Sequence, residues 1–73
     1  MTARLQQTTP RKMMQALQKL GFKITRIKGS HHILRKGDHE TCVALHNKQL
    51  SRGLQTKILK QAGLTIEDIR PYL

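Results

Sequence analysis

The chain is poor in residues on which several classes of protein depend. Its 73 residues include one cysteine, one phenylalanine, one tyrosine and no tryptophan. A single cysteine excludes an internal disulfide and gives no sign of an oxidising compartment. No apolar run approaches the roughly 18 residues of a membrane-spanning helix, and no signal segment stands out. We therefore expect a soluble, cytoplasmic protein.

Acidic residues are also scarce, which leaves a large excess of positive charge. Four acidic residues stand against 14 lysines and arginines, so the formal charge is +10 at pH 7. Such a charge on a small domain points to a polyanionic partner, with nucleic acid before an acidic protein. A membrane surface fits less well, because no segment is an amphipathic helix with aromatic anchors. The two aromatics, Phe22 and Tyr72, are too few for base-stacking platforms, which favours recognition of RNA backbone and shape.

The spacing of apolar residues predicts one small α+β domain with the element order α-β-β-β-α. Residues 1–8 show no apolar rhythm and are expected to form a flexible N-terminus, ahead of a single domain over residues 9–73. A first helix is predicted from Thr9-Pro10 to a left-handed cap at Gly21. Its apolar stripe is Met13, Met14, Leu17 and Leu20.

Three short strands are predicted next, over residues 22–27, 31–36 and 39–45, with turns at residues 29–30 and 37–38. Connections this short favour antiparallel neighbours, so the expected topology is a three-stranded meander. The helices must bury their apolar stripes on one face of this sheet, which leaves the other face for solvent or ligand.

The last third of the chain predicts two further helices. Ser51 is placed to cap the first of them, which ends at Gly63. A short final helix begins at Thr65, has Asp68 as a capping partner and stops before Pro71. The apolar stripe of the longer helix is predicted to be Leu54, Ile58, Leu59 and Ala62.

The candidate chemistry lies in the run Lys28-Gly29-Ser30-His31-His32-Ile33-Leu34-Arg35-Lys36. Alternation along the strand puts His31, Ile33 and Arg35 on one face and His32, Leu34 and Lys36 on the other, and periodicity alone does not say which face is open. An imidazole base can take the proton of a ribose 2′-hydroxyl while Lys or Arg stabilises the charge on the phosphate. A glycine before the histidines lets a backbone amide approach a phosphate. A plain hairpin turn followed by a surface histidine is the alternative.

The other polar residues offer weaker candidates. His31 and His32 point to opposite faces and no Cys-x-x-Cys or His-x-x-x-His pattern occurs, so neither a metal nor another cofactor is predicted. His39 and His46 fit surface positions. Cys42 is expected to pack as a small hydrophobe in the strand core, with a catalytic thiol as the alternative. The basic residues of the helices are expected to be solvated, and these are Arg11, Lys12, Lys19, Arg52, Lys57 and Lys60.

The Gly29-Ser30-His31-His32 block, the hairpin after it, His46 and the run over residues 54–64 together resemble the HicA-type (YcfA-like) toxins. The resemblance covers residues 14–64. It implies a fold like the double-stranded-RNA-binding domain, metal-independent cleavage of mRNA and neutralisation by a cognate HicB-type antitoxin. It also implies that His31 is the catalytic residue and that Gly29 shapes the turn before it.

We therefore expect the toxin of a toxin–antitoxin pair, an endoribonuclease (mRNA interferase) with His31 as general base. The antitoxin is expected to be acidic and to cover the basic face. A non-catalytic RNA-binding module is the alternative, and a protein that only docks an acidic partner is a weaker one. The expected RNA contacts are Lys28, Gly29, Ser30, His32, Arg35 and Lys36.

Overall fold

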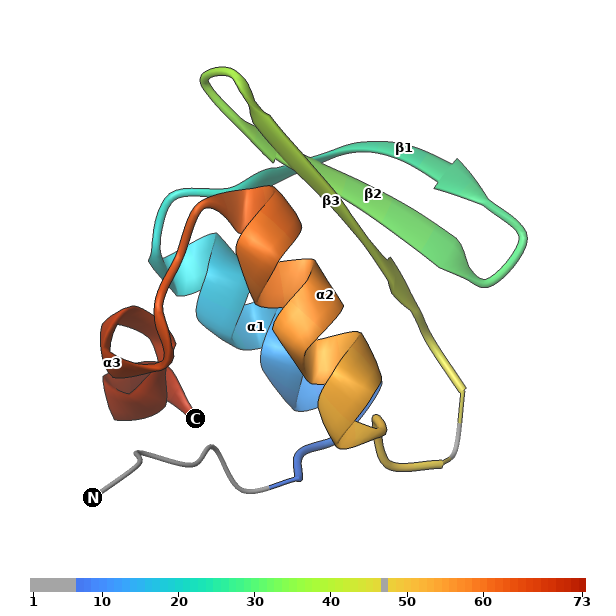
Figure 1. The fold of residues 1–73 in the computed structure, drawn as a ribbon. Coiled ribbons are helices and arrows are strands. Elements are labelled where there is room, and N and C mark those ends of the chain that lie inside the picture. Colours follow the sequence, from blue (N-terminus) through green and yellow to red (C-terminus); the bar gives the residue numbers. More distant parts are fainter. Residues whose placement is uncertain (1–6, 47) are drawn as a thin grey trace.

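In a computed structural model of the chain, a three-stranded antiparallel sheet lies over the helices (Figure 1). The structure describes residues 7–46 and 48–73. The strands are β1 (Lys23–Lys28), β2 (His31–Lys36) and β3 (His39–Ala44), in the spatial order β1-β2-β3. The helices are α1 (Pro10–Lys19), α2 (Arg52–Ala62) and α3 (Ile66–Ile69), followed by a 3₁₀ turn, η1 (Arg70–Tyr72). The predicted α+β class and the meander are confirmed.

The helix ends follow the predicted capping chemistry. The Thr9 side chain accepts a hydrogen bond from the backbone amide of Lys12, and the Ser51 side chain accepts one from that of Leu54. Gly21 and Gly63 follow α1 and α2 with positive φ angles of 105° and 69°. These conformations suit glycine and let the last helical carbonyls be satisfied by amides just beyond the helix. Local sequence therefore fixes where both main helices begin and end.

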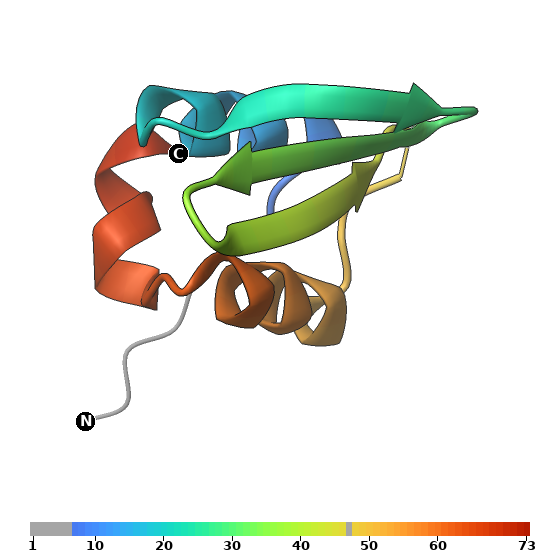
Figure 2. The same cartoon turned by 90° about the horizontal axis from the view of Figure 1, so that it is seen from above.

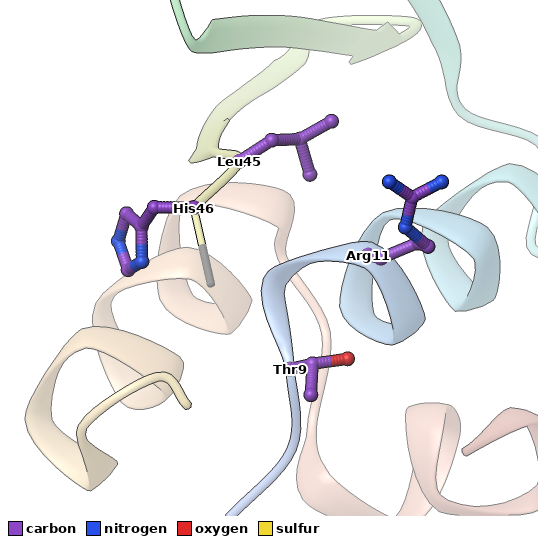
Figure 3. A pocket seen from close by; sticks show the side chains of 4 residues that line it. All are labelled: Thr9, Arg11, Leu45 and His46. Carbon is purple, nitrogen blue, oxygen red and sulfur yellow. The ribbon is translucent and has the colours of Figure 1, made fainter. Parts of the chain in front are cut away.

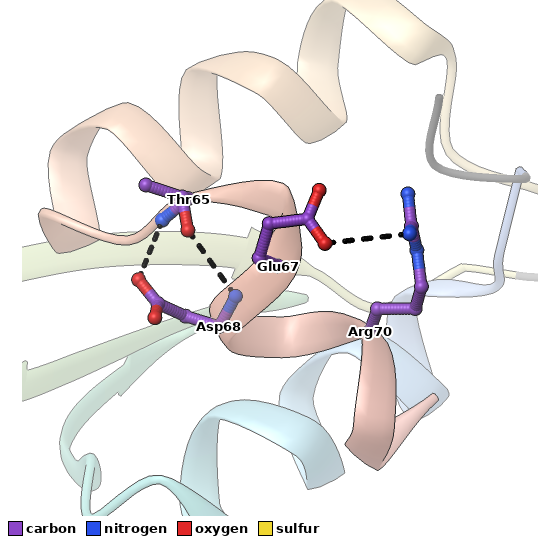
Figure 4. A network of polar contacts seen from close by, with 4 residues as sticks. All are labelled: Thr65, Glu67, Asp68 and Arg70. Atoms are coloured by element: carbon purple, nitrogen blue, oxygen red, sulfur yellow. Dashed lines mark hydrogen bonds and ion pairs between the residues drawn. The ribbon is translucent and has the colours of Figure 1, made fainter. Parts of the chain in front are cut away.

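The C-terminal segment begins with a capping box, drawn in Figure 4. The Thr65 amide donates to Asp68 Oδ2 (2.9 Å), and the Asp68 amide donates to Thr65 Oγ1 (3.2 Å). The hydrogen bond from the Thr65 backbone, and then the contact with its side chain, hold the pKa of Asp68 below its ordinary value. The α-helix ends at Ile69 as expected, and the chain continues through Pro71 as one 3₁₀ turn.

The start of the chain differs in part from expectation. Residues 1–6 of the expected flexible segment lie outside the described residues. Gln7 and Thr8 are hydrogen-bonded to the segment around α2, since Gln7 Nε2 donates to the Leu50 carbonyl (3.3 Å) and the Thr8 amide donates to Gln55 Oε1 (2.9 Å). Thr8 is also buried. Thr8 is therefore part of the packed chain, and the exposed Gln7 is tied to it by a hydrogen bond.

The core lies between the sheet and the two main helices. Its fully buried members come from α1, β2, β3, α2, α3 and the loop before α2, and include Met13, Leu17, Leu34, Val43, Leu50, Ile58 and Ile69. The hydroxyl of Thr41, also buried, donates to the Ile58 carbonyl (3.1 Å) and ties β3 to α2. None of the described helices has the length and apolar character needed to cross a bilayer.

The predicted stripe of α2 is wrong at its first position. Leu54 is 38% exposed, whereas Gln55 is only 2% exposed. Gln55 occupies the i position of an i, i+3, i+4, i+7 stripe that continues through Ile58, Leu59 and Ala62. Its buried side chain accepts the hydrogen bond from the Thr8 amide. A polar residue therefore takes a core position because it satisfies a backbone donor there.

Candidate functional site

The helices cover one face of the sheet only, and Figure 2 views the opposite face. On β2 and β3, Leu34 and Val43 are fully buried against the helices. Because His32 lies directly opposite Val43, it shares this covered face. His31, Ile33 and Arg35 alternate with these residues and point to the other side. The structure thus selects the face that the sequence left undecided, and we call it the open face.

A β-bulge adds basic residues to the open face. The pairing of β1 with β2 shifts between Ile24 and Arg26, so Thr25 is an extra residue in β1. Its hydroxyl donates to the Ile33 carbonyl (3.3 Å). Simple alternation would put Ile24 and Arg26 on the same face, but the bulge turns Arg26 to the open face. Four basic residues of β1 and β2 share the open face. We call them the open-face cations: Lys23, Arg26, Lys28 and Arg35.

His31 begins β2 on the open face and is exposed. In both views of the ribbon, the turn between β1 and β2 extends past the helices (Figures 1 and 2). Gly29 takes a left-handed φ of 60° in that turn, and the Leu45 amide donates to the Ser30 carbonyl (2.8 Å). Lys28 lies directly opposite His31. The imidazole and its neighbouring cation are therefore both accessible at the surface of the fold.

Cys42 is a neighbour of His31, and the predicted core position of Cys42 is wrong. Instead of packing in the strand core, Cys42 lies on the open face opposite Ile33 and is only partly buried. Its Sγ lies 3.6 Å from Nδ1 of His31. Within the described residues, Nε2 of His31 makes no hydrogen bond. The core positions of β3 are filled instead by the residues on either side, Thr41 and Val43.

The structure separates the six residues predicted to contact RNA into three groups. Lys28 and Arg35 share the open face with His31, while Gly29 and Ser30 form the turn before it. His32 lies on the covered face, where its Nδ1–H donates to the Ser30 carbonyl (3.1 Å). Lys36 shares that face, and its ammonium donates to the Leu20 carbonyl at the end of α1 (2.7 Å).

The charges around His31 are almost all positive. Glu40, opposite Arg35, is the acidic residue of the open face. In the part of the chain that the structure describes, no ion pair joins an open-face cation to a carboxylate, and Arg35 Nε donates to the Gly37 carbonyl (3.0 Å). Glu67 is instead paired with Arg70 (3.4 Å) beyond α2 (Figure 4). The open face therefore keeps a positive field that suits a phosphate backbone.

A pocket lies apart from the open face, where α1 begins and β3 ends. This pocket of ≈ 390 Å³ is lined by Thr9, Arg11, Leu45 and His46 (Figure 3). His46 is exposed, as predicted. Across the described residues, no three His, Cys, Asp or Glu side chains come together as metal ligands. The pocket joins two nitrogen-bearing side chains but contains none of the residues of the β2 block.

Lys23 and Arg26 were not singled out from the sequence, and Cys42 was expected in the strand core rather than on the open face. For Lys23, strand alternation was an available signal once the open face was known. Arg26 depends on the bulge, and the contact of Cys42 with His31 depends on the register of β3 against β2, neither of which a local pattern shows.

Comparison with known protein families agrees with this arrangement. A family model described as the HicA toxin of bacterial toxin–antitoxin systems matches residues 10–64. The match spans α1, the whole sheet and α2, and it contains the open face and His31. A comparison with curated proteins found no match.

Proposed function

Since the chain belongs to the HicA family of toxins from bacterial toxin–antitoxin systems, we propose that it is an mRNA endoribonuclease with His31 as its general base. The observation that supports this proposal is the position of His31: exposed, at the entrance of β2, on the face that carries the open-face cations. Among the described residues, Nε2 of His31 has no hydrogen-bond partner, so this nitrogen is available to a substrate.

The proposed reaction needs only a base and positive charge. Nε2 of His31 takes the proton of a ribose 2′-hydroxyl, and the 2′ oxygen attacks the adjacent phosphorus. The bond from phosphorus to the 5′ oxygen of the next nucleotide breaks, and that oxygen takes up a proton. Lys28, opposite His31, stabilises the charge that develops on the phosphate. The products are a 2′,3′-cyclic phosphate and a 5′-hydroxyl, and no step requires a metal ion or another cofactor.

RNA is proposed to lie along the open face. Arg35 binds phosphate together with Lys28, and the turn at Gly29 and Ser30 lets the backbone approach closely. His32 and Lys36 point to the covered face, so we assign them no direct contact there. This recognition is by backbone and shape, as expected for a surface without aromatic side chains on its strands. We place the activity in the cytoplasm, where mRNA is translated.

A toxin of this family has a cognate antitoxin. We propose a HicB-type, acidic antitoxin that covers the open face, because a carboxylate-rich surface would neutralise the open-face cations and block His31. Cleavage should then stop at saturating antitoxin and resume in high salt only if charge dominates the complex. An antitoxin complex that still cleaves RNA at saturation would contradict this arrangement.

The decisive experiment compares two neighbouring histidines on opposite faces. Purified parent protein, His31→Ala and His32→Ala are each incubated with a defined mRNA in EDTA, and fragment ends are mapped. We expect cleavage with 2′,3′-cyclic phosphate ends by the parent and by His32→Ala, and none by His31→Ala. A His31→Ala protein as active as the parent would refute the general base.

The same experiment tests the two alternatives in which the protein is not an enzyme. If none of the three proteins cleaves but all bind the mRNA with similar salt sensitivity, the chain is a non-catalytic RNA-binding module. If none binds RNA at moderate salt, the basic surface serves only an acidic protein partner.

A further inference from the structure

The contact between Cys42 and His31 is the feature of the open face that packing does not explain. The covered face of β3 obtains its core residues from Thr41 and Val43, which are 2% and 0% exposed. Cys42 points to the other face, since it lies opposite Ile33. No helix covers that face of the sheet (Figure 2). A cysteine is therefore not needed at this position for the core, and its thiol lies beside the imidazole of His31.

The register explains how the two side chains meet. His31 lies opposite Ala44 and Ile33 lies opposite Cys42, so Cys42 is the diagonal neighbour of His31 across the two strands. Diagonal neighbours on one face of an antiparallel pair are within reach of a long or aromatic side chain. The imidazole bridges this gap and brings Nδ1 to 3.6 Å from Sγ, a distance at which sulfur takes part in a weak hydrogen bond.

We propose that Cys42 is a positioning residue, which holds the His31 ring with Nδ1 against its sulfur and Nε2 toward the RNA. This inference rests on the proposed function. A histidine that acts as a base through Nε2 must carry its hydrogen on Nδ1, and a sulfur lone pair beside Nδ1 accepts that hydrogen. Cys42 itself touches no substrate. In other enzymes, a carboxylate that accepts a hydrogen bond from the histidine base holds the ring in this way. The sulfur of Cys42 is a weaker acceptor than a carboxylate.

The same hydrogen bond in the opposite direction, with the thiol as donor, would prevent His31 from acting as a base. If the thiol hydrogen pointed to Nδ1, the imidazole hydrogen would be on Nε2, and the nitrogen facing the RNA would be unable to take a proton. The tautomer of the neutral ring therefore decides the role of Cys42. It can be measured without any RNA, which separates this inference from the proposed function.

The test uses Cys42→Ala and Cys42→Ser, which differ by one hydroxyl. Two-bond ¹H–¹⁵N spectra of histidine-labelled protein, recorded above the titration range of the rings, report the tautomer of His31. We expect the Nδ1–H form in the parent, a shift toward the Nε2–H form in Cys42→Ala and recovery in Cys42→Ser. Recovery requires the exposed ring to move by about 1 Å toward the shorter side chain, because an N–H···O hydrogen bond needs a distance of about 2.7–3.2 Å. Unchanged thermal midpoints would show that all three proteins are folded.

Cleavage of the defined mRNA supplies the second measurement. We expect Cys42→Ala to lower kcat by about 3- to 10-fold, the effect of one lost hydrogen bond, with KM unchanged and with recovery in Cys42→Ser. A parent protein in the Nε2–H form, a Cys42→Ala variant with the tautomer and kcat of the parent, or a Cys42→Ser variant no better than Cys42→Ala would each overturn the positioning role. A parent that holds the Nδ1–H tautomer but cleaves no RNA would instead refute the proposed function.

Discussion

The four open-face cations should set the salt dependence of RNA binding. Each phosphate contact with a single strand contributes about 0.7 to the slope of log K against log salt, so four contacts contribute about 2.8. Between about 50 and 200 mM salt, this slope corresponds to a loss of roughly 50-fold in affinity. Replacing Lys23, Arg26, Lys28 and Arg35 together by glutamine should remove that part of the slope. The strand positions of these residues are exposed, so the fold should persist.

The control removes the same charge from the helices. Lys12, Arg52, Lys57 and Lys60 are exposed on α1 and α2, and their replacement by glutamine also lowers the formal charge from +10 to +6. Binding of a His31→Ala background to labelled RNA, measured by fluorescence anisotropy at several salt concentrations, avoids cleavage during the assay. We expect the helix variant to keep most of the parent slope. Equal losses of slope in the two variants would show that total charge, and not the open face, governs binding.

Three further predictions concern stability. Leu34→Ala, at a fully buried position, should lower the free energy of unfolding by about 2–5 kcal/mol in urea titrations, and a loss below about 1 kcal/mol would contradict its place in the core. Gly63→Ala should destabilise more than Gly37→Ala, because both glycines have left-handed φ angles of 60–69° but only at Gly63 would a Cβ meet another side chain, 2.6 Å from Cε1 of His39. The pKa of Asp68 is lower in the folded protein than its ordinary value of 3.8, so the ionised side chain stabilises the fold at pH values above 3.8. This stabilisation is lost as the pH falls through the lower pKa of the folded state. Asp68→Asn should therefore flatten the fall in urea midpoint between about pH 5 and pH 2, and an unchanged pH profile would be evidence against the capping box.

Local chemistry made the element boundaries predictable. Thr9, Ser51 and Thr65 cap their helices as the sequence indicates, because capping depends on residues within one turn. The buried stripe of α2 was predicted to begin at Leu54, because its side chain is apolar, but it begins one residue later at Gln55. The burial of Gln55 depends on the Thr8 amide, which is 47 residues away in sequence.

The composition of the candidate site was less predictable than the fold. His31 was identifiable from its motif, but its face was not, because each set of alternating residues on β2 contains one histidine, one cation and one aliphatic residue. Packing of Leu34 against the helices decides between them. The contact of Cys42 with His31 requires the register between β2 and β3, and Arg26 requires the bulge in β1. Both are properties of strand pairing rather than of any single segment.

Because Thr25 is one extra residue in β1, this strand should tolerate the loss of one residue at the bulge better than the loss of a residue from the regular pairing beside it. Deleting Thr25 would make Ile24 and Arg26 consecutive residues, so Arg26 stays on the open face and Ile24 and Ile27 stay on the covered face. Deleting Ile27 would instead make Arg26 the residue next to Lys28 and turn its side chain to the covered face. Among natural variants of this gene, a one-residue deletion in β1 is accordingly expected at Thr25 rather than at Ile27.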